Sequence, residues 1–153
     1  MKKIQKLIGP DSIFLDIEVS DGHEALAVVA EKLAVLSSVK PEVLIDALEE
    51  RERLGSTSVG DGFAIPHAKL RGLEEILVIL VRFLAPVLLN EKDTVRMVAA
   101  VISPPDQPAA HLQVLSQIAR LLKHQDFRQS LLEAANVDEA VDVLKAMAAR
   151  EGL

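Results

Sequence analysis

Apolar and polar residues follow two different periods along the 153-residue chain. Toward both ends, apolar residues recur every three or four positions, which predicts amphipathic helices with one buried face. In the middle, short runs rich in β-branched residues are bounded by turn formers, which predicts strands. The predicted helices are 21–36, 41–54, 110–123, one beginning near residue 126 and one over 136–148, and the predicted strands are 13–17, 63–66, 76–83 and 95–102.

Polar residues at the helix ends carry further signals. Pro41 suits the first position of a helix, because its missing N–H is not needed there. Asp106 and Asp126 are predicted to lie at the starts of the helices that follow them, as caps or first-turn acids. Asn136, with Glu139 three residues later, resembles a capping box.

The central strands indicate the fold class. The run from Ile76 to Phe83 shows almost no alternation of apolar and polar residues, the pattern of a strand that is covered on both faces. Helices come first, strands lie in the centre and helices come last, which predicts a mixed sheet between helical layers. We therefore expect an α/β fold with helices on both sides of the sheet, formed as a single domain by residues 1–153.

Composition and charge exclude several functions. A formal net charge of −6 argues against nucleic-acid binding, which needs clustered Lys and Arg. The chain has no cysteine, so it has no disulfide or thiolate site, which fits a cytoplasmic location. Arg82 and Pro86 interrupt the longest apolar run, over residues 76–89, which is too short to insert into a membrane. The histidines lack metal-ligand spacing, and we expect neither a metal nor a cofactor.

One histidine lies in a context that suggests chemistry. His67 follows Pro66 at the end of a predicted strand, so the position of its ring is restrained by the local backbone. A neutral imidazole nitrogen is available as a nucleophile near neutral pH. The alternative interpretation is that His67 is a strand-end residue with a satisfied hydrogen bond. Two histidines, an arginine and no cysteine point to phosphoryl chemistry on imidazole.

Other residues could support such chemistry. The loop 55–62 contains glycines and hydroxyls that could hold an anion, with Ser56 or Thr57 as donors. Arg51 could bind phosphate oxygens through two N–H groups. His111 opens a predicted helix, where the helix dipole would lower its pKa. The alternatives are a flexible turn, a solvated helix-end cation and an exposed helix-start residue.

The two segments 51–69 and 104–122 together resemble a known family. Arg51-Glu-Arg-Leu-Gly-Ser-Thr, then Gly60-Asp-Gly-Phe-Ala-Ile-Pro-His67-Ala-Lys, is similar to the active-site signature of the fructose/mannitol-type enzyme IIA domains of the bacterial phosphotransferase system. Pro104-Pro-Asp-Gln and the helix from His111 resemble its second-histidine segment. The likeness extends over nearly the whole chain and is greatest to the nitrogen-regulatory branch.

This resemblance implies a five-stranded mixed sheet and a phosphorylated histidine. By matching position, His67 would accept the phosphate from the small carrier HPr, His111 would support it and Arg51 would stabilise the phosphate. Ser56 and Thr57 would supply secondary contacts. The acceptor would be an enzyme IIB cysteine or a regulatory protein target.

Three features depart from the family pattern. Phe63 replaces an aliphatic residue, Ala68 replaces a frequent glycine, and the connection 86–95 is shorter than usual. Such changes near the site would alter which partner protein binds there.

Three functions remain open at this point. The first is a phosphoryl carrier in the regulatory branch. The second is a sugar-specific enzyme IIA that passes phosphate to an enzyme IIB during fructose- or mannitol-type uptake. The third is a non-catalytic regulatory binding module, whose phosphate would switch its choice of partner without moving onward.

Overall fold

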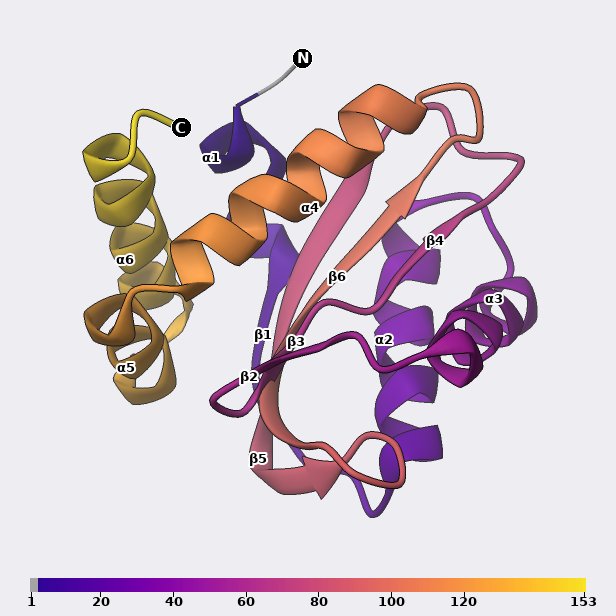
Figure 1. Cartoon of the computed structure of the whole chain (residues 1–153), viewed down its shortest axis with the longest axis horizontal. Coiled ribbons are helices and arrows are strands. Elements are labelled where there is room, and N and C mark those ends of the chain that lie inside the picture. Colours follow the sequence, from indigo (N-terminus) through magenta and orange to yellow (C-terminus); the bar gives the residue numbers. More distant parts are fainter. Residues whose placement is uncertain (1–2) are drawn as a thin grey trace.

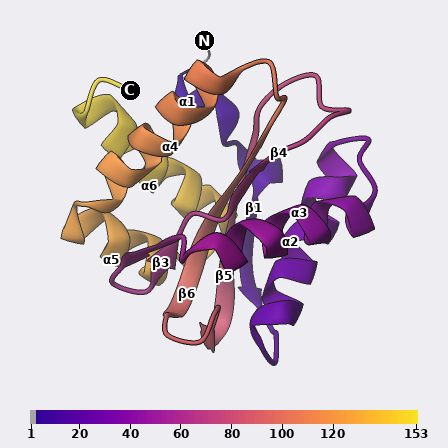
Figure 2. The ribbon, with the colours of Figure 1, turned by 45° about the vertical axis from the view of Figure 1, so that its right-hand side comes forward.

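The computed structural model describes residues 3–153, which form helices on both sides of one mixed sheet (Figures 1 and 2). In chain order the elements are α1 (Ile4–Leu7), a 3₁₀ turn (Pro10–Ser12), β1 (Ile13–Ile17), α2 (Gly22–Leu36), α3 (Pro41–Leu54), β2 (Ser58–Gly60), β3 (Phe63–Ala64), β4 (His67–Lys69), β5 (Leu77–Leu88), β6 (Thr94–Ser103), α4 (Pro108–Leu122), α5 (Gln125–Glu133) and α6 (Val137–Arg150).

The antiparallel pair β5–β6 lies at the centre of the sheet. β1 pairs with the outer edge of β5 in parallel. β3 and β4 follow one another along the other edge of β6, both parallel to it, and β2 pairs with β3 in antiparallel fashion. The predicted mixed α/β sheet in a single domain is confirmed, with six strands among the described residues rather than about five.

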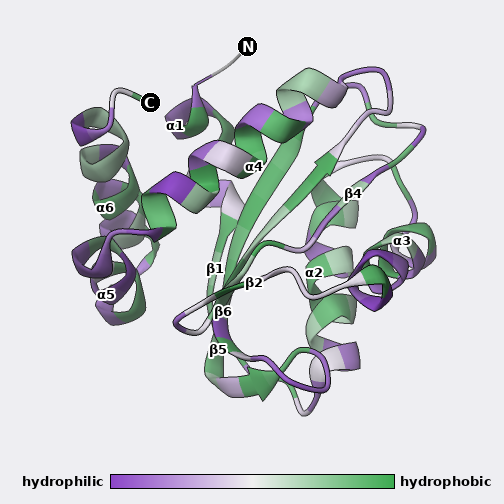
Figure 3. Ribbon diagram, viewed as in Figure 1, coloured by the Kyte–Doolittle hydropathy of each residue, from purple (hydrophilic) through white to green (hydrophobic). Residues whose placement is uncertain are grey.

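Alternate residues of β5 and β6 enter two separate cores. Val78 and Leu80 pack with α1, α4, α5 and α6 on one face, whereas Ile79 and Val81 pack with α2 and α3 on the other. Because both faces are covered, both sets of side chains are apolar, and the hydropathy colouring shows these strands as mostly hydrophobic (Figure 3). The absence of alternation in the sequence therefore correctly predicted a strand buried on both sides.

The predicted strand 63–66 is wrong in its extent. Pro66 has no N–H for the ladder, and the N–H of Ile65 donates to the carbonyl of Thr57 instead. Pairing with β6 therefore stops after Ala64 and resumes at His67. β5 is longer than predicted, because a register shift between Arg82 and Val87 accommodates Pro86 and lets the strand continue.

The helix ends agree with the sequence signals only in part. α4 begins two residues earlier than predicted, at Pro108, and no acidic residue lies in its first turn, so Asp106 has neither of its predicted roles. Asp126 lies in the first turn of α5 but does not cap it, because His124 occupies the cap position. Asn136 does cap α6, by accepting from the N–H of Glu139.

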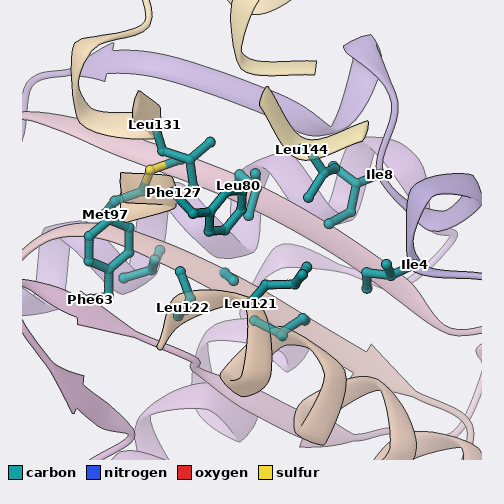
Figure 4. A pocket seen from close by; sticks show the side chains of 13 residues that line it. Ile4, Ile8, Phe63, Leu80, Met97, Leu121, Leu122, Phe127, Leu131 and Leu144 are labelled. Atoms are coloured by element: carbon teal, nitrogen blue, oxygen red, sulfur yellow. The ribbon is translucent and has the colours of Figure 1, made fainter. Parts of the chain in front are cut away.

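The larger core contains a small cavity between the sheet and the helices of that face (Figure 4). Its volume is about 20 Å³, and its walls come from apolar side chains such as Phe63, Met97 and Leu131. A space of this size with no polar partners is expected to stay dry. The cavity is a packing gap and is too small for an organic ligand.

Candidate functional site

His67 begins β4, and its imidazole is fixed by the backbone two residues earlier. The ring is half-buried, and its Nδ1 lies 2.8 Å from the carbonyl oxygen of Ile65. A carbonyl oxygen can only accept a hydrogen bond, so Nδ1 carries the proton. In the neutral ring, Nε2 therefore keeps its lone pair, which is the nucleophilic form of that nitrogen.

Arg51 lies in the last turn of α3 and contacts this same nitrogen. Its Nε donates to Nε2 of His67 at 3.2 Å, and its Nη1 donates to the carbonyl of Gly55 at 2.9 Å. A guanidinium has no acceptor atom, so this contact independently requires a lone pair on Nε2. Arg51 is partly buried and bonded, so the solvated helix-end cation does not describe it.

His111 lies in the first turn of α4 and faces His67. The two ring centroids are 5.6 Å apart, with an angle of 53° between the ring planes. Only 6 % of His111 is exposed, so the exposed helix-start alternative is wrong. Its Nδ1 lies 2.6 Å from Oγ of Ser103, the last residue of β6. The sheet end and the helix start together therefore place the second imidazole.

Burial and nearby cations keep both histidines neutral. Burial lowers the pKa of His67 below its usual value, and Arg51 and Lys69 lower it further, against the raising effect of the Ile65 carbonyl and of Glu52. For His111, burial, with smaller contributions from His67 and Lys69, lowers the pKa to about 4. The sequence predicted this direction for His111 from the helix dipole, whereas burial is the main cause.

The pKa of His111 makes stability depend on pH. Its ordinary value is 6.5 and its folded value is about 4, so between these the unfolded chain binds more protons and acidification favours unfolding. We expect the free energy of unfolding to fall by about 2–3 kcal/mol more in the wild type than in His111→Gln as the pH is lowered from 7 to 4. Urea denaturation across this range measures it, and parallel profiles would contradict the assignment.

The loop between α3 and β2 is held by a buried glutamate that the sequence analysis missed. Glu52 is 9 % exposed, and its carboxylate accepts from the backbone N–H and the hydroxyl of Thr57 and from the side chain of Asn90. Glu52 continues the row of Leu44 and Leu48 on the buried face of α3. The sequence signal that could have identified Glu52 is an acidic residue in an otherwise apolar row of the helix.

The structure places Ser56 and Thr57 beside His67, but their hydroxyl protons are engaged elsewhere. The Thr57 hydroxyl donates to Glu52 at 2.7 Å. The Ser56 hydroxyl donates to the carboxylate of Asp93 and accepts from Asn90. Both residues line the same open hollow as His67, so their position agrees with a site but their donors point into the loop network.

The turn from β2 to β3 closes the loop. Gly60, Asp61 and Gly62 have φ values of 87°, 58° and 83°, a run of left-handed conformations that favours glycine at both ends. The following strand then leads directly to Pro66 and His67.

Apolar side chains lie in the hollow beside His67 and on the helices that carry Arg51 and His111. Val59, which is exposed, and Leu115, which is partly buried, line the hollow with His67. Leu112 follows His111 in α4 and is 66 % exposed, and Leu54, three residues after Arg51, is 81 % exposed. We call Leu54, Val59, Leu112 and Leu115 the apolar rim. Apolar surface beside a polar site is typical of places where another protein binds.

Residues 3–153 offer neither a cluster of metal ligands nor a membrane-spanning helix. No group of three or more His, Cys, Asp or Glu side chains in this range could hold a metal ion. No helix in the described part of the chain is long and apolar enough to cross a membrane.

Comparison with known proteins identifies the family. Residues 6–147 match the family model described as "Phosphoenolpyruvate-dependent sugar phosphotransferase system, EIIA 2". The chain belongs to this family. The resemblance to enzyme IIA domains that residues 51–69 and 104–122 show is therefore confirmed.

Two branches of the family are represented among the relatives. A nitrogen regulatory protein of Bradyrhizobium diazoefficiens is 34% identical over 143 residues, covering 92% of this chain and 94% of that protein. The mannitol-specific EIICBA component of Pasteurella multocida is 30% identical over 137 residues, 88% of this chain but 22% of that protein. The crystal structure of nitrogen regulatory protein IIA-Ntr from Neisseria meningitidis superposes with a TM-score of 0.85 at 27% identity, covering 92% of this chain and 98% of that one.

Proposed function

We propose that this chain is a phosphoryl carrier that takes a phosphoryl group on Nε2 of His67. The observation that carries the proposal is the hydrogen bond from Nδ1 to the Ile65 carbonyl, which leaves Nε2 unprotonated. Family membership supports phosphoryl transfer as the general role. The alternative interpretation of His67 as a satisfied strand-end residue does not account for the second histidine that faces it at a centroid distance of 5.6 Å.

The transfer requires one bond to form and one to break. The lone pair of Nε2 attacks the phosphorus of a phosphohistidine on the donor, and the phosphorus–nitrogen bond to the donor breaks in line with it. The bonding electrons return to the donor imidazole. His67 gives up no proton during this step, because Nδ1–H stays bound to Ile65.

Arg51 and His111 stabilise the charge of the phosphoryl oxygens. Arg51 already donates to Nε2, so when its contact with this nitrogen breaks, the Nε–H is free to donate to an incoming phosphoryl oxygen. His111 adds a neutral imidazole whose ring centroid lies 5.6 Å from that of His67. No metal or cofactor is required in this scheme. Ser56 and Thr57 contribute by holding the loop that forms one wall of the hollow.

The proposed donor is a phosphocarrier protein of the HPr type. The apolar rim supplies a surface on which a small protein can dock, and the net charge of −6 suits a partner with a positive face. The proposed role is in the regulatory branch, which the 34% identity to a nitrogen regulatory protein over nearly its whole length supports. The proposed location is the cytoplasm.

A second role stays open because of the mannitol relative. At 30% identity, that protein supports a sugar-specific enzyme IIA that hands its phosphate to an enzyme IIB. The regulatory binding module, whose phosphate switches its choice of partner, differs from both carriers because its phosphoryl group does not move onward.

A phosphorylation assay tests the proposal. We expect the protein, incubated with enzyme I, an HPr-type carrier and phosphoenolpyruvate, to take up one phosphate that is labile in acid and stable in base. Intact-mass measurement gives the stoichiometry. Adding an enzyme IIB then separates the two roles, because a sugar-specific enzyme IIA loses its phosphate quickly and a regulatory protein keeps it. A protein that stays unphosphorylated with an active donor contradicts the proposal.

A further inference from the structure

A buried hydroxyl contacts the second histidine on the side away from solvent. Ser103 is fully buried at the end of β6, and its Oγ lies 2.6 Å from Nδ1 of His111. Among the hydrogen bonds of the described residues, this is the one made by the Ser103 hydroxyl. The backbone carbonyl of Ser103 accepts a separate hydrogen bond, from the N–H of Leu70.

Two arrangements of the protons are compatible with the short distance between Oγ of Ser103 and Nδ1 of His111: either the ring nitrogen or the hydroxyl is the donor. If Nδ1 of His111 carried a proton and donated it, the hydroxyl hydrogen of Ser103 would be buried with no acceptor. A buried donor left without an acceptor destabilises the folded protein. If the hydroxyl donates to Nδ1 instead, both the buried hydroxyl hydrogen and Nδ1 have a partner. Nδ1 then has the lone pair, and the neutral ring carries its proton on Nε2.

We propose that Ser103 is a positioning residue that holds His111 in the Nε2–H tautomer, opposite to the Nδ1–H tautomer of His67. The inference about the tautomer stands on the resting structure, and its consequence for transfer rests on the proposed function. His67 then presents a lone pair and His111 presents an N–H donor. A nucleophile and an adjacent donor for a phosphoryl oxygen are the two groups that the transfer needs.

The low pKa of His111 supports the same arrangement. A ring with a pKa of about 4 is neutral at pH 7, so its tautomer decides whether it can donate through Nε2 at all. Burial is the main cause of this low pKa, with smaller contributions from His67 and Lys69, and all three disfavour the imidazolium, which would carry protons on both nitrogens. Without the Ser103 hydroxyl, the neutral ring could put its proton on either nitrogen, and part of the population would present a lone pair to the phosphoryl oxygens.

Long-range ¹H–¹⁵N correlation spectra of the imidazole rings test the tautomers in the unphosphorylated protein at pH 7.5. In the wild type we expect His111 to be protonated on Nε2 and His67 on Nδ1. In Ser103→Ala we expect the His111 signals to shift toward a mixture while those of His67 stay unchanged. Ser103→Thr, which keeps the hydroxyl, should restore the Nε2–H form.

Phosphorylation rates provide the second measurement. We expect Ser103→Ala to slow the transfer step about 10–100-fold, the range found when the partner that orients a metal-binding histidine is removed, with little change in the KM for the donor. Ser103→Thr should recover most of the rate. A wild-type His111 protonated on Nδ1, or a Ser103→Ala protein with the wild-type tautomer and rate, overturns the inference.

The outcomes separate this inference from the proposed function. The wild-type spectrum alone decides the tautomer, so a variant that fails to fold does not weaken the test. A protein that has the expected tautomers but takes up no phosphate would contradict the proposed function and leave the assignment of Ser103 as the tautomer-setting group in place.

Discussion

His67→Ala is expected to take up no phosphate from a phosphorylated HPr-type carrier, while its fold is retained. The variant removes Nε2, the one nitrogen that two separate hydrogen bonds identify as unprotonated. Loss of the bond to the Ile65 carbonyl should cost about 1 kcal/mol of folding free energy. Intact mass after incubation measures the phosphate, and the thermal midpoint measures the fold.

His23→Ala is the matched control for this variant. His23 is an exposed histidine, paired with Glu49 near the start of α2 and away from β4. It should be phosphorylated at the wild-type rate. Wild-type labelling of His67→Ala would show that another residue is the nucleophile, with His111 as the next candidate.

Arg51→Ala is expected to slow phosphorylation about 10²–10³-fold, and Arg51→Lys to lose less. Removing a donor aimed at the charge of the transferring group has a cost of this size. Lysine keeps the positive charge but loses the planar pair of N–H groups, which now span Nε2 of His67 and the carbonyl of Gly55. Single-turnover transfer from the phosphorylated carrier measures the rates.

Arg53→Ala provides the control for charge in the same helix turn. Arg53 is exposed and makes a 3.8 Å ion pair with Glu49, so its loss should change neither rate nor stability appreciably. Both Arg51 variants should melt within a few degrees of the wild type, because alanine and lysine are good helix formers. Equal rates for all three variants would show that Arg51 takes no part in the transfer, and a large loss of stability would make its role structural.

The sequence predicted the elements that local pattern determines. The apolar run of β5, the proline at the start of α3 and the asparagine that caps α6 each act through neighbours in the chain. β2, β3 and β4 are only two or three residues long, and they exist because β6 offers an edge with which β3 and β4 can pair. So few residues show no periodicity, so the boundaries of these strands could not be predicted from the sequence.

The residues of the candidate site likewise fall into those that the sequence predicted and those that it did not. His67, His111 and Arg51 were identified from motif and context, and the structure brings their side chains together. Glu52 and Ser103 were missed, since each acts by reaching a group that the fold brings near, the hydroxyl of Thr57 in one case and a ring of α4 in the other.

The position of the phosphate on the protein tests the central claim most directly. Phosphorylated, ¹⁵N-histidine-labelled protein can be studied by ¹H–¹⁵N–³¹P correlation, which assigns the phosphorus to one ring nitrogen. The geometry predicts a single phosphohistidine with the phosphorus on Nε2 of His67 and the proton of Nδ1 still bound to the carbonyl of Ile65. A phosphorus on Nδ1 of His67, or on either nitrogen of His111, would contradict the account.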